Sequence, residues 1–197
     1  MKLVIASNNN HKIREIQEIV GEFFPEIYSM RQAGIVLEVE ETGETFQENA
    51  ILKAEQTLQA ADGFDAAIAD DSGLMVDALF GAPGVYSARY AGEGHDDAAN
   101  NAKLIEEMNG VPDAERTCRF VSAIALARRG KPTLCVTGAY EGVLLRALQG
   151  EGGFGYDPLF YDPQKEKTFA SMSAEEKNAI SHRRMALEAL KVSLEQV

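Results

Sequence analysis

The chain has 197 residues, of which 45% are hydrophobic, and its formal net charge is −12. This hydrophobic content excludes a disordered chain, and the negative charge argues against a nucleic-acid backbone or an anionic membrane as a partner. A small anionic substrate is still compatible, provided that a local basic cluster or a metal ion receives it.

Further features of the sequence favour one cytoplasmic protein with a large core. A chain of this length forms one domain or two lobes. Cys118 and Cys135 lie in apolar runs without metal-ligand spacing, which is typical of reduced thiols in the cytosol. Residues 1–6 are too short for a signal sequence, and no stretch is long enough for a membrane helix.

The hydrophobic pattern predicts helices and strands in alternation. A strand is expected at residues 2–6 and a helix over 11–24, where apolar side chains recur at three- and four-residue steps. A capping box, Thr45 to Glu48, begins a second helix that continues to Ala61.

The remaining elements complete an α/β fold with a mixed sheet. In chain order we expect a strand at 66–70, a strand at about 74–78, a long loop at 81–90, a helix from Asp96 to about Asn109, an antiparallel hairpin of residues 116–128 and 133–146, and helical structure from Ser173 onward, again with a capping box.

Two adjacent carboxylates, Asp70 and Asp71, follow the apolar residues 66–69, and the strand is expected to end there in a turn at Gly73. Successive strand side chains point to opposite faces, so one aspartate can project into a crevice while the other is tied down. Neighbouring anions favour a hard cation such as Mg²⁺, which binds to carboxylates and substrate phosphates. A solvated Asp-Asp-Ser-Gly turn is the alternative.

Residues 7–12, Ser-Asn-Asn-Asn-His-Lys, join the first strand to the first helix. Backbone N–H groups at a helix N-terminus bind anions, and Lys12 adds positive charge, so this segment is a candidate phosphate site. It is not a P-loop, because the glycines and the Gly-Lys-Ser/Thr ending are absent. An ordinary polar turn would have the same composition.

Carboxylates also stand before the second helix, at Glu40 and Glu41, and Asn49 and Lys53 share a face of that helix. This segment could lie close to the two aspartates in the folded protein. A capped and solvated helix start is the alternative.

A glycine-rich segment at 150–158 contains G-x-G-x-x-G, but Asp157-Pro158 follows instead of a helix, which excludes a dinucleotide fingerprint. Glycines on both sides of Phe154 let the backbone approach a flat ligand while the ring stacks on it. A plain glycine-rich turn with a packed ring is the alternative.

Lys177 and the run Ser181-His182-Arg183 lie near the C-terminus, and His182 and Arg183 are donors suited to a nucleobase carbonyl or a phosphate. A polar helix start explains them equally well.

Together these segments resemble the inosine triphosphate pyrophosphatase family, and they occur in the order expected for it over the whole chain. Members of this family clear non-standard purine nucleotides such as dITP and XTP. The segments that carry the resemblance are Ser7-x-Asn9-x-x-Lys12, Glu41-Thr42-Gly43-x-Thr45-Phe46-x-Glu48-Asn49-Ala50-x-x-Lys53-Ala54, Ala69-Asp70-Asp71-Ser72-Gly73-Leu74, Pro83-Gly84-Val85-Tyr86-Ser87-Ala88-Arg89-Tyr90, Gly153-Phe154-Gly155-Tyr156-Asp157-Pro158 and Ser181-His182-Arg183.

The resemblance implies a fold, a partner and site residues. The fold would be an elongated mixed sheet in two lobes around a cleft, with residues 1–197 as one domain and a homodimer as the assembly. Glu40 and Asp71 would bind Mg²⁺, and Asp71 would also be the catalytic acid or base. The implied nucleotide-binding residues are Ser7, Asn8, Asn9, Asn10, His11, Lys12, Lys53, Ser72, Phe154, Gly155, Tyr156, Asp157, Lys177, His182 and Arg183.

The implied reaction is attack of water, assisted by Asp71 and Mg²⁺, on the α-phosphorus of ITP, dITP or XTP, which gives the monophosphate and pyrophosphate. Lys12, Lys53 and Lys177 would stabilise the leaving pyrophosphate. Two alternatives stay open at this point: a Mg²⁺-dependent nucleotide pyrophosphatase with another base preference, and a nucleotide-binding module without turnover.

Overall fold

The strands form one mixed sheet in the computed structural model, which describes residues 1–196 with the exception of the side chain of His11. The sheet order is β2-β1-β3-β4-β5-β6-β7. The strands are β1 (Lys2–Ile5), β2 (Glu26–Ser29), β3 (Ala66–Val76), β4 (Thr117–Arg128), β5 (Lys131–Leu144), β6 (Phe160–Asp162) and β7 (Lys167–Thr168). β1 is parallel to β2 and β3, whereas β6 is antiparallel to β5 and β7, so the predicted mixed α/β class is confirmed.

The chain divides into two compact units. The first unit comprises residues 1–71, 122–138 and the chain from 183 onward, and the second comprises residues 72–121 and 139–182.

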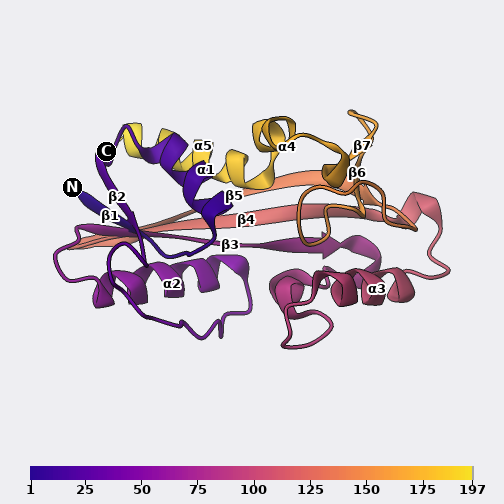
Figure 1. Cartoon of the computed structure of the whole chain (residues 1–197), viewed down its shortest axis with the longest axis horizontal. Coiled ribbons are helices and arrows are strands. Elements are labelled where there is room, and N and C mark those ends of the chain that lie inside the picture. Colours follow the sequence, from indigo (N-terminus) through magenta and orange to yellow (C-terminus); the bar gives the residue numbers. More distant parts are fainter. Residues whose placement is uncertain (197) are drawn as a thin grey trace. The chain divides into compact units, whose positions relative to one another are not determined.

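In the first unit, helices cover both faces of the sheet (Figure 1). Helices α1 (Asn10–Val20) and α5 (His182–Glu195) lie on one face, and α2 (Phe46–Ala60) lies on the other. The core between the sheet, α1 and α5 contains Leu3, Ile5, Ile16, Val20, Ile68, Leu126 and Leu187. These apolar faces fix the two helices against the strands that carry the site.

The helix α1 ends at Val20, earlier than the predicted Phe24. Glycine has a low helix propensity, and Gly21 begins a turn in which the N–H groups of Phe23 and Phe24 both bond to the Val20 carbonyl. The Phe24 side chain is thereby buried in the core.

Both predicted capping boxes are present. The Thr45 side chain accepts from the Glu48 N–H, and the Glu48 carboxylate accepts from the Thr45 N–H, so α2 begins at Phe46. Ser173 and Glu176 do the same at the start of α4 (Ala174–Ile180). Ser181 has an extended conformation and separates α4 from α5, because serine is favoured at helix starts over helix interiors.

In the second unit, an aromatic core packs around Phe120, Phe160 and Phe169. Helix α3 (Asp97–Glu107) begins at the N-cap Asp96, as predicted, and the predicted loop at 81–90 contains a 3₁₀ helix, Gly84–Arg89. The short strands β6 and β7, like β2 of the first unit, were not predicted.

The strand β3 corrects one prediction, since it continues through Gly73 where a turn was expected. Gly73 is a site of close approach: a Cβ there would lie 2.3 Å from the Ser87 Oγ, which accepts from the Leu74 N–H. Gly73 is therefore needed for close packing against Ser87 inside the strand, and it does not mark a turn.

Cys118 and Cys135 are free thiols. Among residues 1–196, no helix is both long and apolar enough to cross a membrane.

Candidate active site

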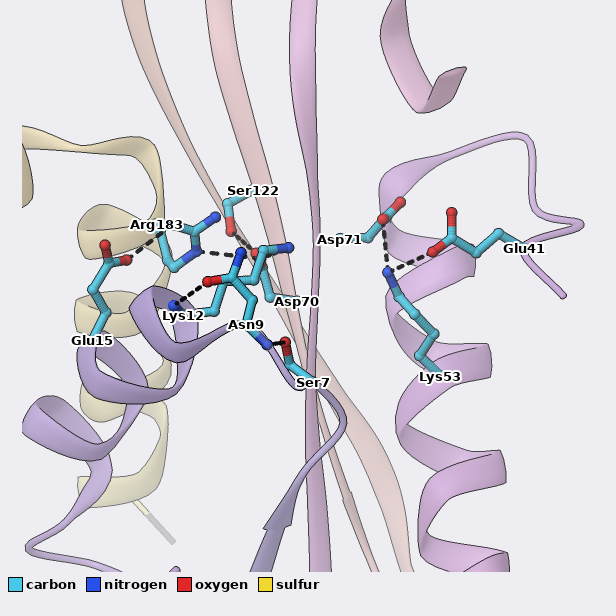
Figure 2. Close-up of polar contacts among 10 residues, drawn as sticks. All are labelled: Ser7, Asn9, Lys12, Glu15, Glu41, Lys53, Asp70, Asp71, Ser122 and Arg183. Carbon is cyan, nitrogen blue, oxygen red and sulfur yellow. Dashed lines mark hydrogen bonds and ion pairs between the residues drawn. The ribbon is translucent and has the colours of Figure 1, made fainter. Parts of the chain in front are cut away.

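Asp70 and Asp71 lie on opposite faces of β3, as the alternation of strand side chains predicts (Figure 2). β1 pairs with β3 only as far as Ile68, so both carboxylates lie just beyond the end of this parallel pair. Asp70 faces α1 and α5, and Asp71 faces α2.

Asp70 is 6% exposed and accepts from three donors. Its carboxylate lies 2.6 Å from Lys12 Nζ, 3.2 Å from Arg183 Nε and 2.6 Å from Ser122 Oγ. Burial by itself would raise the pKa of Asp70, but the charges of Arg183 and Lys12 outweigh it and hold this pKa well below its usual range. Asp70 is therefore a permanent anion with saturated contacts.

Arg183 extends this ion-pair network, since its Nη1 lies 2.9 Å from Glu15 Oε2. Burial lowers the pKa of Arg183, but Asp70 and Glu15 raise it overall. The chain of contacts Lys12–Asp70–Arg183–Glu15 ties α1 to β3 and α5 (Figure 2). The two cations and two anions compensate one another.

Asp71 has a different environment. Its Oδ1 lies 2.8 Å from Lys53 Nζ on α2, while its Oδ2 is buried and has no hydrogen-bond partner. Burial raises the pKa of Asp71, the neighbouring carboxylates Glu41 and Asp70 add to the effect, and Lys53 opposes it. An unpartnered oxygen on a carboxylate with a raised pKa is suited to accept a proton or to bind a cation.

Lys53 joins Asp71 to Glu41, whose Oε1 lies 3.1 Å from the Nζ. Burial lowers the pKa of Lys53, but the two carboxylates raise it overall, so the ammonium is charged. Glu41 is thus the carboxylate beside Lys53, whereas Glu40 is exposed. Glu40 as a metal ligand stays a prediction.

The donors at this site fit a hard cation. Mg²⁺ is commonly held by one or two carboxylates together with substrate phosphates, and Asp71 Oδ2 with the Glu41 carboxylate fits that set. Among the described side chains, which exclude that of His11, no three from His, Cys, Asp or Glu gather closely enough to form a metal site by themselves.

The segment at residues 7–12 is a capped helix start. Ser7 Oγ accepts from the Asn9 N–H at 3.0 Å, and Asn9 Oδ1 accepts from the Lys12 N–H at 3.3 Å (Figure 2). Asn8 and Asn10 are exposed beside this cap, and the side chain of His11 lies outside the described part of the structure. The polar groups of the segment thus lie at the N-terminus of α1, where an anion is favoured.

In the second unit, the Phe154 ring is 46% exposed, and Lys177 Nζ lies 4.3 Å from its centroid. Asp157 Oδ2 accepts from the Phe154 N–H at 2.9 Å and from Lys177 Nζ at 2.5 Å. Asp157 therefore orders the exposed ring and the cation together.

The other predicted nucleotide-binding residues of this unit are less exposed. The Tyr156 hydroxyl donates to the Ser87 carbonyl, and its ring is buried in the core. The His182 ring is buried and stacks on Phe120 at 5.0 Å. Ser72 is half-buried in β3, and Gly155, at φ 61°, contacts α3.

Several residues with well-defined contacts were not predicted. Glu15 could have been found, because it is three positions after Lys12 and so shares its helix face. Ser122, Asp97 and Asn101 contact residues more than fifty positions away, and no local pattern indicates such contacts.

The fold and these two groups of residues define an α/β protein with a carboxylate–lysine site on its parallel strands. The sequence matches the Ham1 family over residues 3–193, and the chain belongs to this family.

Relatives named "dITP/XTP pyrophosphatase" support the resemblance found in the sequence. The protein of Clostridium perfringens is 48% identical, with 100% of this chain and 98% of that one covered, and the protein of Desulforamulus reducens is 53% identical, with 95% and 92% covered.

Solved structures agree with these relatives. The Ham1 protein of Staphylococcus aureus is 42% identical with a TM-score of 0.91, and 100% of this chain and 99% of that one are covered. A nucleoside-triphosphatase / dITP/XTP pyrophosphatase of Mycobacterium abscessus is 41% identical with a TM-score of 0.81, and 96% and 98% are covered.

Proposed function

We propose that this protein is a nucleoside triphosphate pyrophosphatase that hydrolyses ITP, dITP and XTP to the monophosphate and pyrophosphate. The observation that carries the proposal is the environment of Asp71, which combines a buried unpartnered oxygen with an ion pair to Lys53. The relatives named dITP/XTP pyrophosphatase, which match almost the whole chain, support the substrate class.

Asp71 is the proposed catalytic residue. Lys53 binds its Oδ1 and so fixes the direction of the carboxylate. One lone pair of the Oδ2 would accept the proton of an attacking water molecule, and the other would face the bound cation. In the absence of a bound cation, burial raises the pKa of Asp71, so its carboxylate is a stronger base than that of an ordinary aspartate. Attack at the α-phosphorus would release pyrophosphate and leave the monophosphate.

Mg²⁺ is the proposed cofactor, and Asp71 and Glu41 are the residues that would hold it, with Glu40 as the alternative ligand implied by the sequence. When bound, Mg²⁺ would supply positive charge to the phosphate oxygens. Lys53 contributes charge from the protein itself, because its ammonium is held between both carboxylates.

The N-terminus of α1 is the proposed phosphate cradle. Backbone N–H groups at a helix start can bind an anion. Lys12 adds a positive charge there, and its side chain is 21% exposed while its ammonium contacts Asp70. Asp70 keeps Lys12 in place and would itself make no contact with substrate.

Residues of the second unit are proposed to bind the base. Phe154 would stack on the purine, with Lys177 and Asp157 as polar groups beside it. His182 of this unit and Arg183 of the first unit are each proposed as a donor to O6 of hypoxanthine or xanthine. Ser72, Gly155 and Tyr156 complete the proposed nucleotide-binding set.

The resemblance also implies features of the whole protein. The match over residues 3–193 supports a single pyrophosphatase domain. The two lobes around a cleft, the homodimer and the cytoplasmic location stay proposals.

The test is pyrophosphate release by the purified protein with Mg²⁺ across ITP, dITP, XTP, GTP, ATP and pyrimidine triphosphates. We expect IMP and pyrophosphate from ITP, with inorganic phosphate absent as a direct product. Formation of IDP and phosphate would contradict attack at the α-phosphorus. A preference for a pyrimidine would favour another base specificity, and binding without turnover would favour a nucleotide-binding module.

A further inference from the structure

The first turn of α3 holds the backbone of Gly155 from both sides. Asp97 Oδ2 accepts from the Gly155 N–H at 2.7 Å, and Asn101 Nδ2 donates to the Gly155 carbonyl at 2.8 Å. The same Nδ2 donates at 2.8 Å to the carbonyl of Asp97. One helix therefore fixes the two peptide groups that flank this glycine.

The Gly153–Gly155 stretch needs such an external restraint. Gly153 and Gly155 have positive φ angles of 74° and 61°, and glycine is the residue with the most backbone freedom. Phe154 lies between them and is 46% exposed, so the protein core does not enclose its ring. Asp157 binds the Phe154 N–H from one side, which leaves the Gly155 side to α3.

The chemistry of Asn101 suits a donor role. Its side chain is 4% exposed, and its amide nitrogen faces two carbonyl oxygens, whereas its Oδ1 has no hydrogen-bond partner. Burial of an amide has a cost that its hydrogen bonds must offset. Here those bonds go to the backbone of Asp97 and Gly155.

The contact of Asp97 is separable from the capping of α3. The N-cap is Asp96, whose carboxylate accepts from the N–H groups of Ala98 and Ala99. Asp97 is the first residue of the helix, and its carboxylate reaches Gly155 instead. Neighbouring aspartates thus have different partners.

We propose that Asp97 and Asn101 are positioning residues that order Phe154 through Gly155, so that the exposed ring is held rigid as a stacking surface. The consequence for nucleotide binding rests on the proposed function, in which Phe154 stacks on the purine. The ordering of Phe154 itself does not depend on that function.

The chain contains no tryptophan, so Phe154→Trp introduces a single fluorophore at the position of interest. In this background, Asp97→Ala and Asn101→Ala should lower the residual fluorescence anisotropy and increase quenching by acrylamide. Asp97→Asn retains an oxygen acceptor for the Gly155 N–H and should restore both values. Asp96→Ala is the matched control, because it weakens the helix start without contact to Gly155.

Steady-state kinetics with Phe154 in place give a second measurement. Asp97→Ala and Asn101→Ala should raise KM for ITP, dITP and XTP alike by about five- to tenfold, a part of what stacking contributes per base. kcat should stay near the value of the unaltered protein, because Asp71 and Lys53 are untouched. Asp96→Ala should leave KM unchanged.

Unchanged anisotropy and quenching in both Asp97→Ala and Asn101→Ala would overturn the proposal. Increased mobility with an unchanged KM would confirm that Asp97 and Asn101 order Phe154 but would overturn the role of that order in nucleotide binding. If Asn101→Ala fails to fold, the Asp97 variants test the proposal, because the Asp97 side chain is exposed and its replacement leaves the core intact. Absence of turnover in the unaltered protein would contradict the proposed function alone, and the fluorescence would still decide the ordering of Phe154.

Discussion

Lys53 contacts Asp71 at 2.8 Å and leaves the adjacent Asp70 to Lys12, so two neighbouring carboxylates each have a lysine of their own on opposite faces of one strand. This arrangement distinguishes a structural carboxylate from a catalytic one, a distinction that the local sequence pattern does not make. Asp70 has saturated contacts and a lowered pKa, whereas Asp71 has an unpartnered oxygen and a raised pKa. Catalysis is therefore expected to depend on Asp71 and stability on Asp70.

The first prediction concerns Asp71→Asn. The substitution retains the volume of the side chain and the contact of an oxygen with Lys53, but it removes the basic oxygen. We expect kcat to fall by roughly 10²-fold or more, the scale for loss of one transition-state electrostatic group. Pyrophosphate release at saturating Mg²⁺ measures it, and turnover close to that of the unaltered protein would exclude Asp71 as the base.

The second prediction concerns Asp70→Asn, which leaves Lys12 and Arg183 with one anion fewer in a buried network. We expect a loss of about 3–5 kcal/mol in the free energy of unfolding, the scale for breaking a buried ion pair. Urea denaturation measures this loss. The matched variant Asp71→Asn, at a less completely buried position, should lose clearly less stability.

The lowered pKa of Asp70 also makes the stability of the protein depend on pH. The pKa of Asp70 is lowered on folding, so its contribution to stability is fully present above the unfolded pKa of about 4 and is lost as the pH falls toward the folded pKa. Asp70→Asn should therefore reduce the difference between stability at neutral and at acid pH. If the free energy of unfolding fell equally with pH in the unaltered protein and in Asp70→Asn, the result would contradict the ion-pair network assigned to Asp70.

The third prediction concerns Gly73→Ala. A Cβ at this position would lie 2.3 Å from Ser87 Oγ and 2.7 Å from the Gly84 carbonyl oxygen, so the backbone must shift. We expect a loss of about 1–3 kcal/mol, the usual cost of overpacking. Gly94→Ala is the control, since a Cβ there meets no atom within 4 Å. Equal melting temperatures for the two variants would contradict the close approach.

Gly73 also shows why part of the fold could not be predicted. A glycine after Asp-Asp-Ser indicates a turn locally, and only the distant Ser87 shows that it serves close packing inside β3. The capping boxes at Thr45 and Ser173 were predicted correctly because their donors and acceptors lie three residues apart. Contacts between residues within one turn of a helix can be predicted from the sequence. Contacts between residues far apart in the chain cannot.

The same distinction holds for the site. Strand alternation predicted that Asp70 and Asp71 would point to opposite faces, and they do. It could not predict which lysine each would contact, since that depends on how α1 and α2 pack. The sequence named Glu40 as the metal ligand and could not predict that Glu41 would contact Lys53, because residues 35–43 form no regular element whose period would orient them.

The fourth prediction concerns the selectivity for the base. Hypoxanthine and xanthine present the acceptor O6 where adenine presents an amino group, and a donor such as Arg183 would pair only with O6. Sites built to bond such a group can reject its analogue by several orders of magnitude in kcat/KM. Arg183→Ala should therefore reduce the ratio of kcat/KM for ITP to that for ATP. Phe154→Ala should weaken the binding of both substrates alike, because every base offers a π-face.

Arg183 also contacts Asp70 and Glu15, so its replacement disturbs the ion-pair network as well as any contact with the base. Glu15→Gln separates the two effects, because it removes one partner of the Arg183 guanidinium but leaves the arginine in place. We expect Glu15→Gln to reduce stability while the ratio of kcat/KM for ITP to that for ATP stays near its original value. If Arg183→Ala lowered ITP and ATP turnover by the same factor, and Glu15→Gln did likewise, Arg183 would be a structural residue of the α1–α5 network, and selectivity would have to come from His182 or another donor.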